Sequence, residues 1–480
     1  MRCGTVIGLE VHAELSTEAK IFCPCPAVFS ARPNAHVCPV CVGLPGALPR
    51  FNPAVLESAL LLGTALGCDI AGRAVFDRKH YFYPDLPKGY QITQRREPIC
   101  SGGTVEIFGC GAEESSADVV APKVIRLHGI HMEEDSARIV CGGSSSLIDF
   151  NRSGVPLLEI VTKPDFGSAT EVIAFLEKLR ETLLFLGICD CKMHEGSLRV
   201  DVNVSIPPDF ARTETKNINS FRAIRRAIEA EEARQIAVLE GGSQVASETR
   251  GWDDATGRSH PMRAKEVYRY MPEPDLPPIA IDRRLVERVR GSQPETAAGR
   301  RERYVREMGL SRDEAAALTA HKATADLFED LASASGEPLE SARLVLGGIR
   351  RHMNRAGLPA DGLAVDVGRL STLVLAVTSG RIGRAAYGET VAAVLERSVD
   401  PDEYIRAQGL ALTADASAAE AAVAAVLAEN PTALAEYRGG KTKVFGFLMG
   451  QVMARLGAGA DPRIARRVLG ERVEGPGTRG

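Results

Sequence analysis

Alternation of apolar and polar residues predicts strands in the first part of the chain. In "IGLEVHAEL", apolar residues alternate with Glu10, His12 and Glu14. Successive side chains of a strand point to opposite faces, so this segment predicts one apolar face and one face that carries two carboxylates and an imidazole. A polar face in water is the simpler interpretation of one such strand.

Further segments place acids in apolar surroundings. "HMEEDS" sets Glu133, Glu134 and Asp135 side by side, and "VPLLEIVTKPD" surrounds Glu159 with apolar residues. "RVDVNVSI" alternates again with Asp201 and Asn203, and "TETKNINSF" offers Glu214 and Lys216 in a predicted loop before a helix. Each segment alone favours a solvated face. If their oxygen atoms line one cavity, Mg²⁺ is the natural occupant, because it prefers carboxylates, amides and water to sulfur.

Helical patterns and a composition shift predict three domains. "SATEVIAFLEKLRETLLFLG" has an apolar stripe at helical spacing, begins after a capping Ser168 and ends at Gly187. A second helix is expected from Ser220 to Gly241. Strand signals fade near residue 294, and helical patterns rich in Ala, Leu, Arg and Glu follow. The predicted fold is α+β: a mixed body with a largely antiparallel sheet over 1–294, an all-α domain over 295–400 and a small all-α tail over 401–480.

Composition agrees with a soluble globular protein. The 480 residues are 45% hydrophobic and 25% charged, and the net charge of −4 excludes a wholly basic nucleic-acid coat. The last segment differs, because Arg438–Gly480 holds nine Lys or Arg against three Asp or Glu. Such a charge suits a phosphate backbone, although a solvated helix face has the same pattern. The candidate contacts are Arg438, Lys441, Lys443, Arg455, Arg463, Arg466 and Arg467.

No apolar run approaches the roughly 20 residues that span a bilayer, and "MRCGTVIGLEVH" lacks the regions of a signal peptide. We therefore expect a cytoplasmic protein without membrane contact.

Cysteine spacing predicts a metal site rather than disulfides. The count of eleven is odd, and no export signal is visible. Cys23-Pro-Cys25 and Cys38-Pro-Val-Cys41 form two short-spaced pairs, which can converge tetrahedrally on a structural zinc ion in a loop over 23–41. Free buried thiols are the alternative.

Cationic and aromatic residues gather in "FDRKHYFYPDLPKGYQITQ" between prolines and a glycine. Arg78, Lys79, Lys88, Tyr81 and Tyr83 could hold phosphates and stack on a base or ribose. A surface loop with capping tyrosines is the alternative.

These segments together closely resemble the B subunit family of the aspartyl/glutamyl-tRNA amidotransferases. The matching text includes "IGLEVHAEL", "CPVCVGLPGALP", "HMEEDS", "DFNRSGVPLLEIVTKPD", "EGSLRVDVNVS", "KNINSF", "RYMPEPDLPP" and "GFLMGQVM", spread over nearly the whole chain. Departures are small: Arg138 stands where the family tends to have lysine, and Met271 where an aromatic is usual.

The resemblance implies a ligase subunit of a cytosolic heterotrimer with a glutaminase A subunit and a small C subunit. The B subunit would phosphorylate the side-chain carboxylate of misacylated Glu-tRNA(Gln) or Asp-tRNA(Asn) with ATP, and ammonia from the A subunit would complete the amide. The three domains would be a catalytic cradle, a helical domain and a tRNA-binding tail. The resemblance is also compatible with a non-discriminating aminoacyl-tRNA synthetase as a further partner.

The same resemblance implies roles for particular residues. Catalytic candidates are Glu10, His12, Glu133, Glu134, Glu159 and Lys79, and all but Lys79 are candidate magnesium ligands. Candidate nucleotide-binding residues are Arg78, Lys79, Lys88, Tyr81, Tyr83, Asp201, Asn203, Glu214 and Lys216. Asp201 is also a candidate ligand or supporting acid. The implied cofactors are ATP, magnesium and structural zinc.

A zinc-organised RNA-binding scaffold without a catalytic centre is the competing hypothesis. The two hypotheses differ in geometry: an enzyme requires the acids to converge with Lys79 in one cleft, and a scaffold does not.

Overall fold

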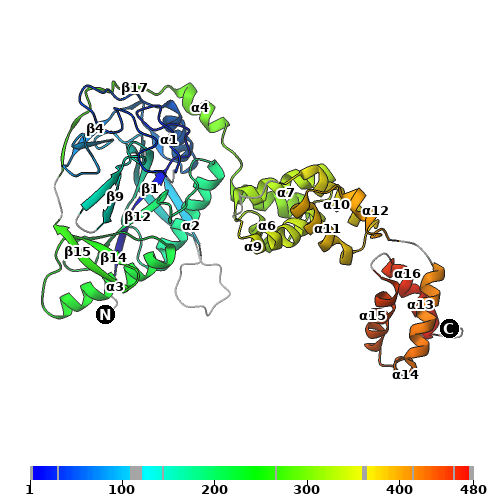
Figure 1. The fold of residues 1–480 in the computed structure, drawn as a ribbon. Helices are drawn as coiled ribbons and strands as arrows, with labels where there is room; N and C mark the ends of the chain where they lie inside the picture. The colour runs from blue at the N-terminus through cyan, green and yellow to red at the C-terminus, as the bar shows by residue number, and fades with distance from the viewer. Residues whose placement is uncertain are drawn as a thin grey trace. The chain divides into compact units, whose positions relative to one another are not determined.

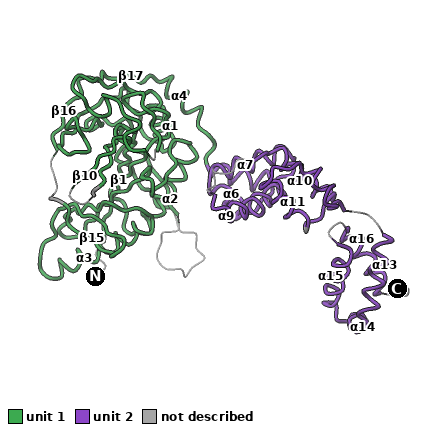
Figure 2. Tube along the Cα trace, viewed as in Figure 1, with its two compact units in different colours: residues 1–296 green, residues 297–480 purple. Residues whose placement is uncertain are grey.

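The computed structural model describes residues 4–29, 32–108, 122–142, 145–264, 268–358, 365–412, 416–457 and 460–474. The chain divides into two compact units, residues 1–296 and 297–480 (Figure 2).

One large sheet organises the first unit. Its strands are β15 (Arg258–Ala264), β14 (Glu248–Asp253), β13 (Thr213–Lys216), β12 (Leu198–Ser205), β1 (Val6–Glu14), β11 (Pro156–Thr162), β8 (Lys123–Glu134), β6 (Cys100–Ser101) and β2 (Asp69–Ile70), in that order, and β7 (Thr104–Ile107) also pairs with β8. Within the described residues every pairing in this sheet is antiparallel except β13 with β14. The prediction of an α+β fold with a largely antiparallel sheet is therefore confirmed.

Shorter strands form separate small sheets. One contains β16 (Arg269–Pro272), β4 (Asp77–His80) and β5 (Tyr90–Thr93), and it carries Lys79. The others pair β9 (Arg138–Gly142) with β10 (Ser145–Asp149), and β17 (Ile279–Ala280) with β3 (Arg73–Ala74).

Helices cover the apolar face of the large sheet. Side chains of α1 (Pro53–Ala65), α2 (Ala169–Leu186) and α3 (Phe221–Glu240) share one core cluster with the buried residues of β1, β11, β8 and β12. Figure 1 shows α2 and α3 side by side against this sheet, and α4 (Arg283–Gly291) follows near the end of the unit. Burial of apolar side chains on this face leaves the opposite face of the sheet for polar groups.

The two long helices begin and end where the sequence predicts. The Ser168 side chain accepts a hydrogen bond from the Glu171 N–H, and Gly187 ends α2 in the left-handed conformation with φ of 70°. Ser220 caps α3 in the same way by accepting from the Ala223 N–H. One local prediction was wrong: Glu214 and Lys216 lie in strand β13 and not in a loop, because Thr213 and Thr215 alternate with them as its buried residues.

The second unit is all helical in its described residues, as predicted. It contains α5 (Ala297–Met308), α6 (Arg312–Leu318), α7 (Lys322–Ser335), α8 (Pro338–Arg343), the π-helix η1 (Leu344–Ile349), α9 (Arg350–Ala356), α10 (Val367–Thr378), α11 (Arg384–Arg397), α12 (Pro401–Ala407), α13 (Ala416–Glu429), α14 (Pro431–Arg438), α15 (Val444–Leu456) and α16 (Pro462–Glu474). No helix in the described part of the chain is long and apolar enough to cross a membrane.

Two separate hydrophobic clusters lie in this unit. The first has buried members from Tyr304 to Leu410, and the second from Ala419 to Val473. Ile405 and Leu410 pack in the first cluster. The domain boundaries expected at residues 294 and 400 stay predictions.

The central position of β11 generates a stability prediction. Leu158 is fully buried in β11, and Leu147 in β10 is 67% exposed. We expect Leu158→Ala to lower the free energy of unfolding by about 2–5 kcal/mol, because the truncation removes buried apolar surface and leaves a cavity. The matched control Leu147→Ala should change it by less than about 0.5 kcal/mol.

Urea denaturation followed by tryptophan fluorescence measures this difference. The single tryptophan, Trp252, is buried in β14 of the same sheet and therefore reports on this unit. Equal midpoints for the two variants would contradict the assignment of Leu158 to the core.

Candidate active site

Strand register brings the acidic residues of distant segments onto one face of the large sheet. His12 of β1 pairs with Glu159 of β11, and Glu159 pairs with His131 of β8. On the other side Glu10 pairs with Asp201 of β12. Paired residues of an antiparallel sheet project from the same face. This face is therefore polar across its central strands, and the opposite face holds the core.

A cavity of about 520 Å³ opens over this polar face. The sequence-predicted residues that line it are Glu10, His12, Lys79, Glu133, Glu159, Asp201, Glu214 and Lys216. The geometric condition for an enzyme is therefore met: acids from several strands converge with Lys79 in one cleft.

Three carboxylates from neighbouring strands form the first acidic group. Oxygen atoms of Glu10, Asp201 and Glu214 all lie within 4.8 Å of one another, a spacing that could hold a metal ion. Two cations already contact this group. Arg212 donates from Nη2 to Glu10 Oε1 at 2.6 Å, and Lys216 forms ion pairs with Asp201 and, at 3.2 Å, with Glu214. Burial opposes the charge of Lys216, but these two carboxylates outweigh it and raise the pKa of the lysine.

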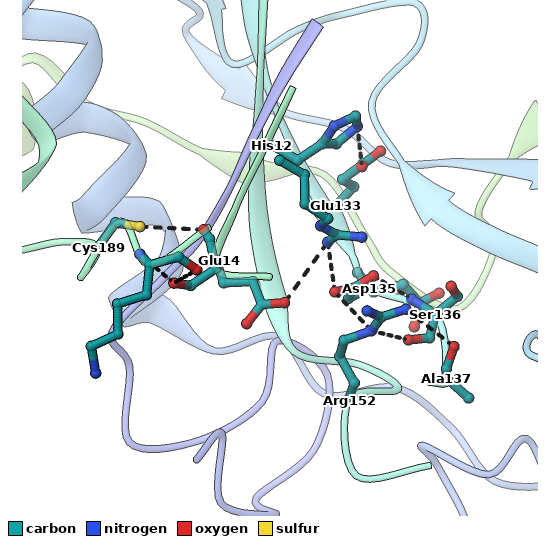
Figure 3. Close-up of polar contacts among 12 residues, drawn as sticks. His12, Glu14, Glu133, Asp135, Ser136, Ala137, Arg152 and Cys189 are labelled. Carbon is teal, nitrogen blue, oxygen red and sulfur yellow. Dashed lines mark hydrogen bonds and ion pairs between the residues drawn. The ribbon is translucent and has the colours of Figure 1, made fainter. Parts of the chain in front are cut away.

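His12, Glu133 and Glu159 form the second group. The His12 Nε2 atom lies 3.5 Å from Glu133 Oε1 and 3.8 Å from Glu159 Oε1, and Figure 3 shows His12 directed at Glu133. Burial lowers the pKa of His12 to about 4, although Glu159 acts in the opposite direction. The imidazole is therefore neutral at pH 7 and keeps a lone pair for a hydrogen bond or a metal.

Burial and the neighbouring Glu159 raise the pKa of Glu133 to about 8. The Thr93 hydroxyl donates to Glu133 Oε2 at 3.0 Å. Like charges held together in a desolvated site repel, so this pair favours either a proton or a cation.

Lys79 approaches the same acids from the small sheet. Its Nζ lies 4.8 Å from the centre of the Tyr268 ring. Burial alone would lower the pKa of Lys79, but Glu133, Tyr270 and Glu159 raise it, so the amine is charged at neutral pH.

Several predicted residues do not line the cavity. Glu134 follows Glu133 in β8 and therefore points to the opposite face, where it pairs with Lys88 and accepts from the Ile92 N–H at 2.8 Å. Glu134 and Lys88 line another cavity, of about 410 Å³, together with Cys23 and Cys41.

The remaining nucleotide-binding candidates are also elsewhere. Arg78 donates to both carboxylate oxygens of Glu273 at 2.8 Å, so its charge is already compensated. Tyr81 packs near Tyr268, and Tyr83 is 60% exposed. Asn203 lies beside the first acidic group, where its Nδ2 donates to Glu10 Oε1 at 3.4 Å. Arg78 and Lys79 are neighbours in sequence but do not share a site, because successive residues of strand β4 point to opposite faces.

Sequence reasoning missed part of the lining. The additional residues are Thr93, Gln94, Arg95, His128, His131, Val161, Arg212, Glu248, Thr249, Tyr268 and Tyr270. Tyr270 could have been found from the sequence, because it stands in "RYMPEPD", part of a segment that carries the family resemblance. In the structure it pairs with Lys79 across β16 and β4. The Arg95 guanidinium lies 5.7 Å from the centre of the Tyr270 ring.

The four predicted cysteines come together. The sulfur atoms of Cys23, Cys25, Cys38 and Cys41 all lie within 4.8 Å of one another. The Cys38 N–H donates to Cys41 Sγ at 3.1 Å, and the pKa of Cys41 is lowered first by its hydrogen bond with Cys23 and also by the charge of Lys20. Four clustered thiols, one with thiolate character, form a donor set compatible with zinc.

Comparison with known proteins agrees with this architecture. Residues 5–287 match the family model described as the GatB/GatE catalytic domain, and residues 326–473 match the one described as the GatB domain. Proteins named as B subunits of the aspartyl/glutamyl-tRNA(Asn/Gln) amidotransferase match over nearly the whole chain. The protein from Lachnoclostridium phytofermentans is 43% identical, with 97% of this chain and 98% of the relative covered. That from Anaeromyxobacter dehalogenans strain 2CP-C is 44% identical, with 97% of each chain covered.

A third relative, from Caldicellulosiruptor saccharolyticus, is 42% identical and is covered over its full length by 99% of this chain. A family match over more than half of the chain and such long, similar relatives decide the assignment. The chain belongs to the family of B subunits of the tRNA-dependent aspartyl/glutamyl amidotransferases.

Proposed function

We propose that this chain carries out the ATP-dependent step of tRNA-linked amidation. It phosphorylates the side-chain carboxylate of Glu-tRNA(Gln), Asp-tRNA(Asn) or both, and the acyl phosphate then reacts with ammonia to give the amide. The observation that carries the proposal is one cavity in which acidic groups from six strands meet a neutral histidine and the charged Lys79.

The chemistry requires such a site. A carboxylate is a poor acyl electrophile because its oxygen cannot leave, and conversion to an acyl phosphate supplies a leaving group. Transfer of a phosphoryl group between two anions needs charge neutralisation and in-line positioning. Magnesium supplies this neutralisation when it is bound. Lys79 lies beside the acids and would bind a phosphate oxygen.

The chain offers two sets of magnesium ligands. Glu10, Asp201 and Glu214 have the oxygen spacing of a metal site. Glu133 and Glu159, with the neutral His12, form the other set, although imidazole is an unusual magnesium ligand. In the first set the ion would replace contacts that Arg212 and Lys216 make in its absence.

The four cysteines would hold a structural zinc ion. Among its described residues the loop over 23–41 has few buried apolar side chains, so metal binding would contribute much of its folding free energy.

The names of the relatives indicate a multi-subunit amidotransferase. We therefore propose that a glutaminase A subunit supplies the ammonia, that a small C subunit completes a cytoplasmic heterotrimer, and that the tail over 401–480 binds tRNA. Convergence of the acids in one cavity favours this enzyme over the RNA-binding scaffold, which would not need it.

A charge-neutral substitution in the cavity tests the catalytic proposal. We expect Glu10→Gln to lower ATP-dependent formation of Gln-tRNA(Gln) on the order of 100-fold, because it removes a charged metal ligand. Binding of tRNA and glutamine hydrolysis by the A subunit should be retained. The assay uses the chain purified with both partner subunits.

Glu18→Gln is the matched control, because Glu18 is exposed just beyond the same strand and does not line the cavity. Undiminished amide formation by Glu10→Gln would refute the catalytic assignment.

Metal analysis tests the zinc proposal. The wild-type chain should contain about one zinc per chain, and Cys38→Ser should lose it because three sulfur ligands do not complete a structural tetrahedral site. Cys68→Ser is the control, since Cys68 lies outside the cluster. Identical zinc contents in Cys38→Ser and wild type would reject this ligand set.

Salt dependence tests the tail. All seven candidate basic residues are exposed, but Lys441, Arg455 and Arg463 form ion pairs with acidic neighbours. We expect Arg467→Gln to reduce the slope of log affinity for tRNA against log salt by about one, because one phosphate contact is lost. Arg463→Gln, whose charge is compensated by Asp461, should have a smaller effect. The reverse order of the two variants would contradict the proposed contact surface.

A further inference from the structure

Asp135 joins three segments close in sequence to the cavity-lining Glu133. It follows the last residue of β8 and is 3% exposed. Arg199 of β12 donates to its carboxylate at 2.6 Å, and the Arg152 Nε lies 3.3 Å from the same oxygen. Figure 3 shows Asp135 between the Arg152 side chain and the strands that carry His12 and Glu133. A buried carboxylate with two guanidinium partners holds its neighbours in place, because loss of either partner would leave an uncompensated buried charge.

Arg152 also holds the chain that leaves β8. Its guanidinium donates to the carbonyl oxygens of Ser136 at 3.0 Å and Ala137 at 3.2 Å. The backbone of Asp135 is hydrogen-bonded to Val155 and Gly154, each at 2.9 Å. Because Glu133 lies two residues before Asp135, these contacts constrain the backbone at the end of β8 and with it the position of the Glu133 side chain in the cavity.

Arg199 connects Asp135 to the strand that carries His12. It pairs with His12 in the register of β12 and β1, and its Nη2 is 3.8 Å from the carboxylate of Glu14 on β1. The contacts of Asp135 therefore connect to both members of the His12–Glu133 pair.

The segment 149–154, which contains Arg152, is also hydrogen-bonded to the cysteine loop. The Ser153 hydroxyl donates to the Cys41 carbonyl at 2.7 Å, and the His36 N–H donates to Asn151 Oδ1 at 2.9 Å. The fully buried Lys20 donates from Nζ to the carbonyls of His36 at 2.8 Å and Phe150 at 3.2 Å. The loop and the segment thus share several directional bonds to backbone groups.

We propose that the segment 149–154 couples metal occupancy of the four-cysteine loop to the geometry of the acidic cavity, with Arg152 as the positioning residue. The inference rests on the proposed function for the identity of the two metal sites. A metal bound to the sulfur atoms of Cys38 and Cys41 fixes the backbone that Ser153 and Lys20 contact. The segment then holds Arg152 on Asp135, and Asp135 holds the end of β8.

Coupling of this kind is reciprocal and appears as a change in affinity at the distant site. Loss of the loop metal should loosen the segment and therefore weaken cation binding at the cavity.

Binding of Mn²⁺ to the full-length chain, followed by electron paramagnetic resonance, measures the coupling without reference to activity. Mn²⁺ accepts the same oxygen ligands as Mg²⁺. We expect Cys38→Ser and Arg152→Met each to raise the dissociation constant of Mn²⁺ about 10-fold. Arg152→Met should keep its zinc. The double variant should bind no more weakly than the weaker single variant, because both changes interrupt one connection.

Arg126→Met is the control for charge removal, since Arg126 lies in β8 itself and pairs with Asp165 rather than with Asp135. It should leave Mn²⁺ binding unchanged. Arg152→Lys keeps the charge beside Asp135 but not both carbonyl bonds, so it should have an intermediate effect. Should Arg152→Met fail to fold, this variant carries the test in its place.

Three results would overturn the proposal. The first is unchanged Mn²⁺ binding in Cys38→Ser after its zinc is lost. The second is multiplication of the two single effects in the double variant, which would make the sites independent. The third is a wild-type chain that does not bind Mn²⁺, or one whose Mn²⁺ binding is insensitive to both Glu10→Gln and Glu133→Gln; this result alone would also refute the cation site of the proposed function.

Discussion

The candidate site depends on repulsion between carboxylates that the sheet holds on one face. Strand pairing sets the distances among Glu10, Asp201 and Glu214 and between His12 and Glu159, and these distances cannot relax without a change of register. A change of register by one residue would move the apolar partners out of the core, so packing on the opposite face keeps the acids together. Burial, together with Glu159 on the same face, raises the pKa of Glu133, and the cations Arg212 and Lys216 compensate the first acidic group.

The sequence predicts the strands of this face better than it predicts the site. Alternation identifies β1 and β12 and the residues that share a face, because it depends only on the period of a strand. It cannot say which strands are neighbours, and the order β13, β12, β1, β11, β8 brings together segments up to about 200 residues apart. Arg95, Arg212 and Tyr268 were missed for this reason, since each enters the cavity through tertiary packing.

Adjacent acids in "HMEEDS" show the limit of reasoning from a motif. Glu133 faces the cavity, Glu134 faces Lys88 on the other side, and Asp135 leaves the strand to meet Arg152 and Arg199. Three neighbouring carboxylates therefore have three environments. The pKa of Glu133 is raised by burial and by Glu159, whereas burial of Asp135 is outweighed by Arg199 and Arg152, which lower its pKa. Three acids that look alike in the sequence therefore have different contacts, because two of them alternate along strand β8 and the third follows the end of that strand.

Cations in the cavity are not equivalent, and the difference bears on how the site would divide its work. Arg212 and Lys216 are already bonded to the first acidic group. Within the described residues Lys79 has no carboxylate within ion-pair distance, and its Nζ instead lies over Tyr268. Arg95 is likewise placed beside an aromatic ring, that of Tyr270. A phosphate group that enters the cavity would therefore meet Lys79 and Arg95 without first breaking an ion pair. Because β4 and β16 carry Lys79 and Tyr270 while β1, β12 and β13 carry the first acidic group, separate elements would supply the phosphate-binding and the metal-binding groups of the proposed function.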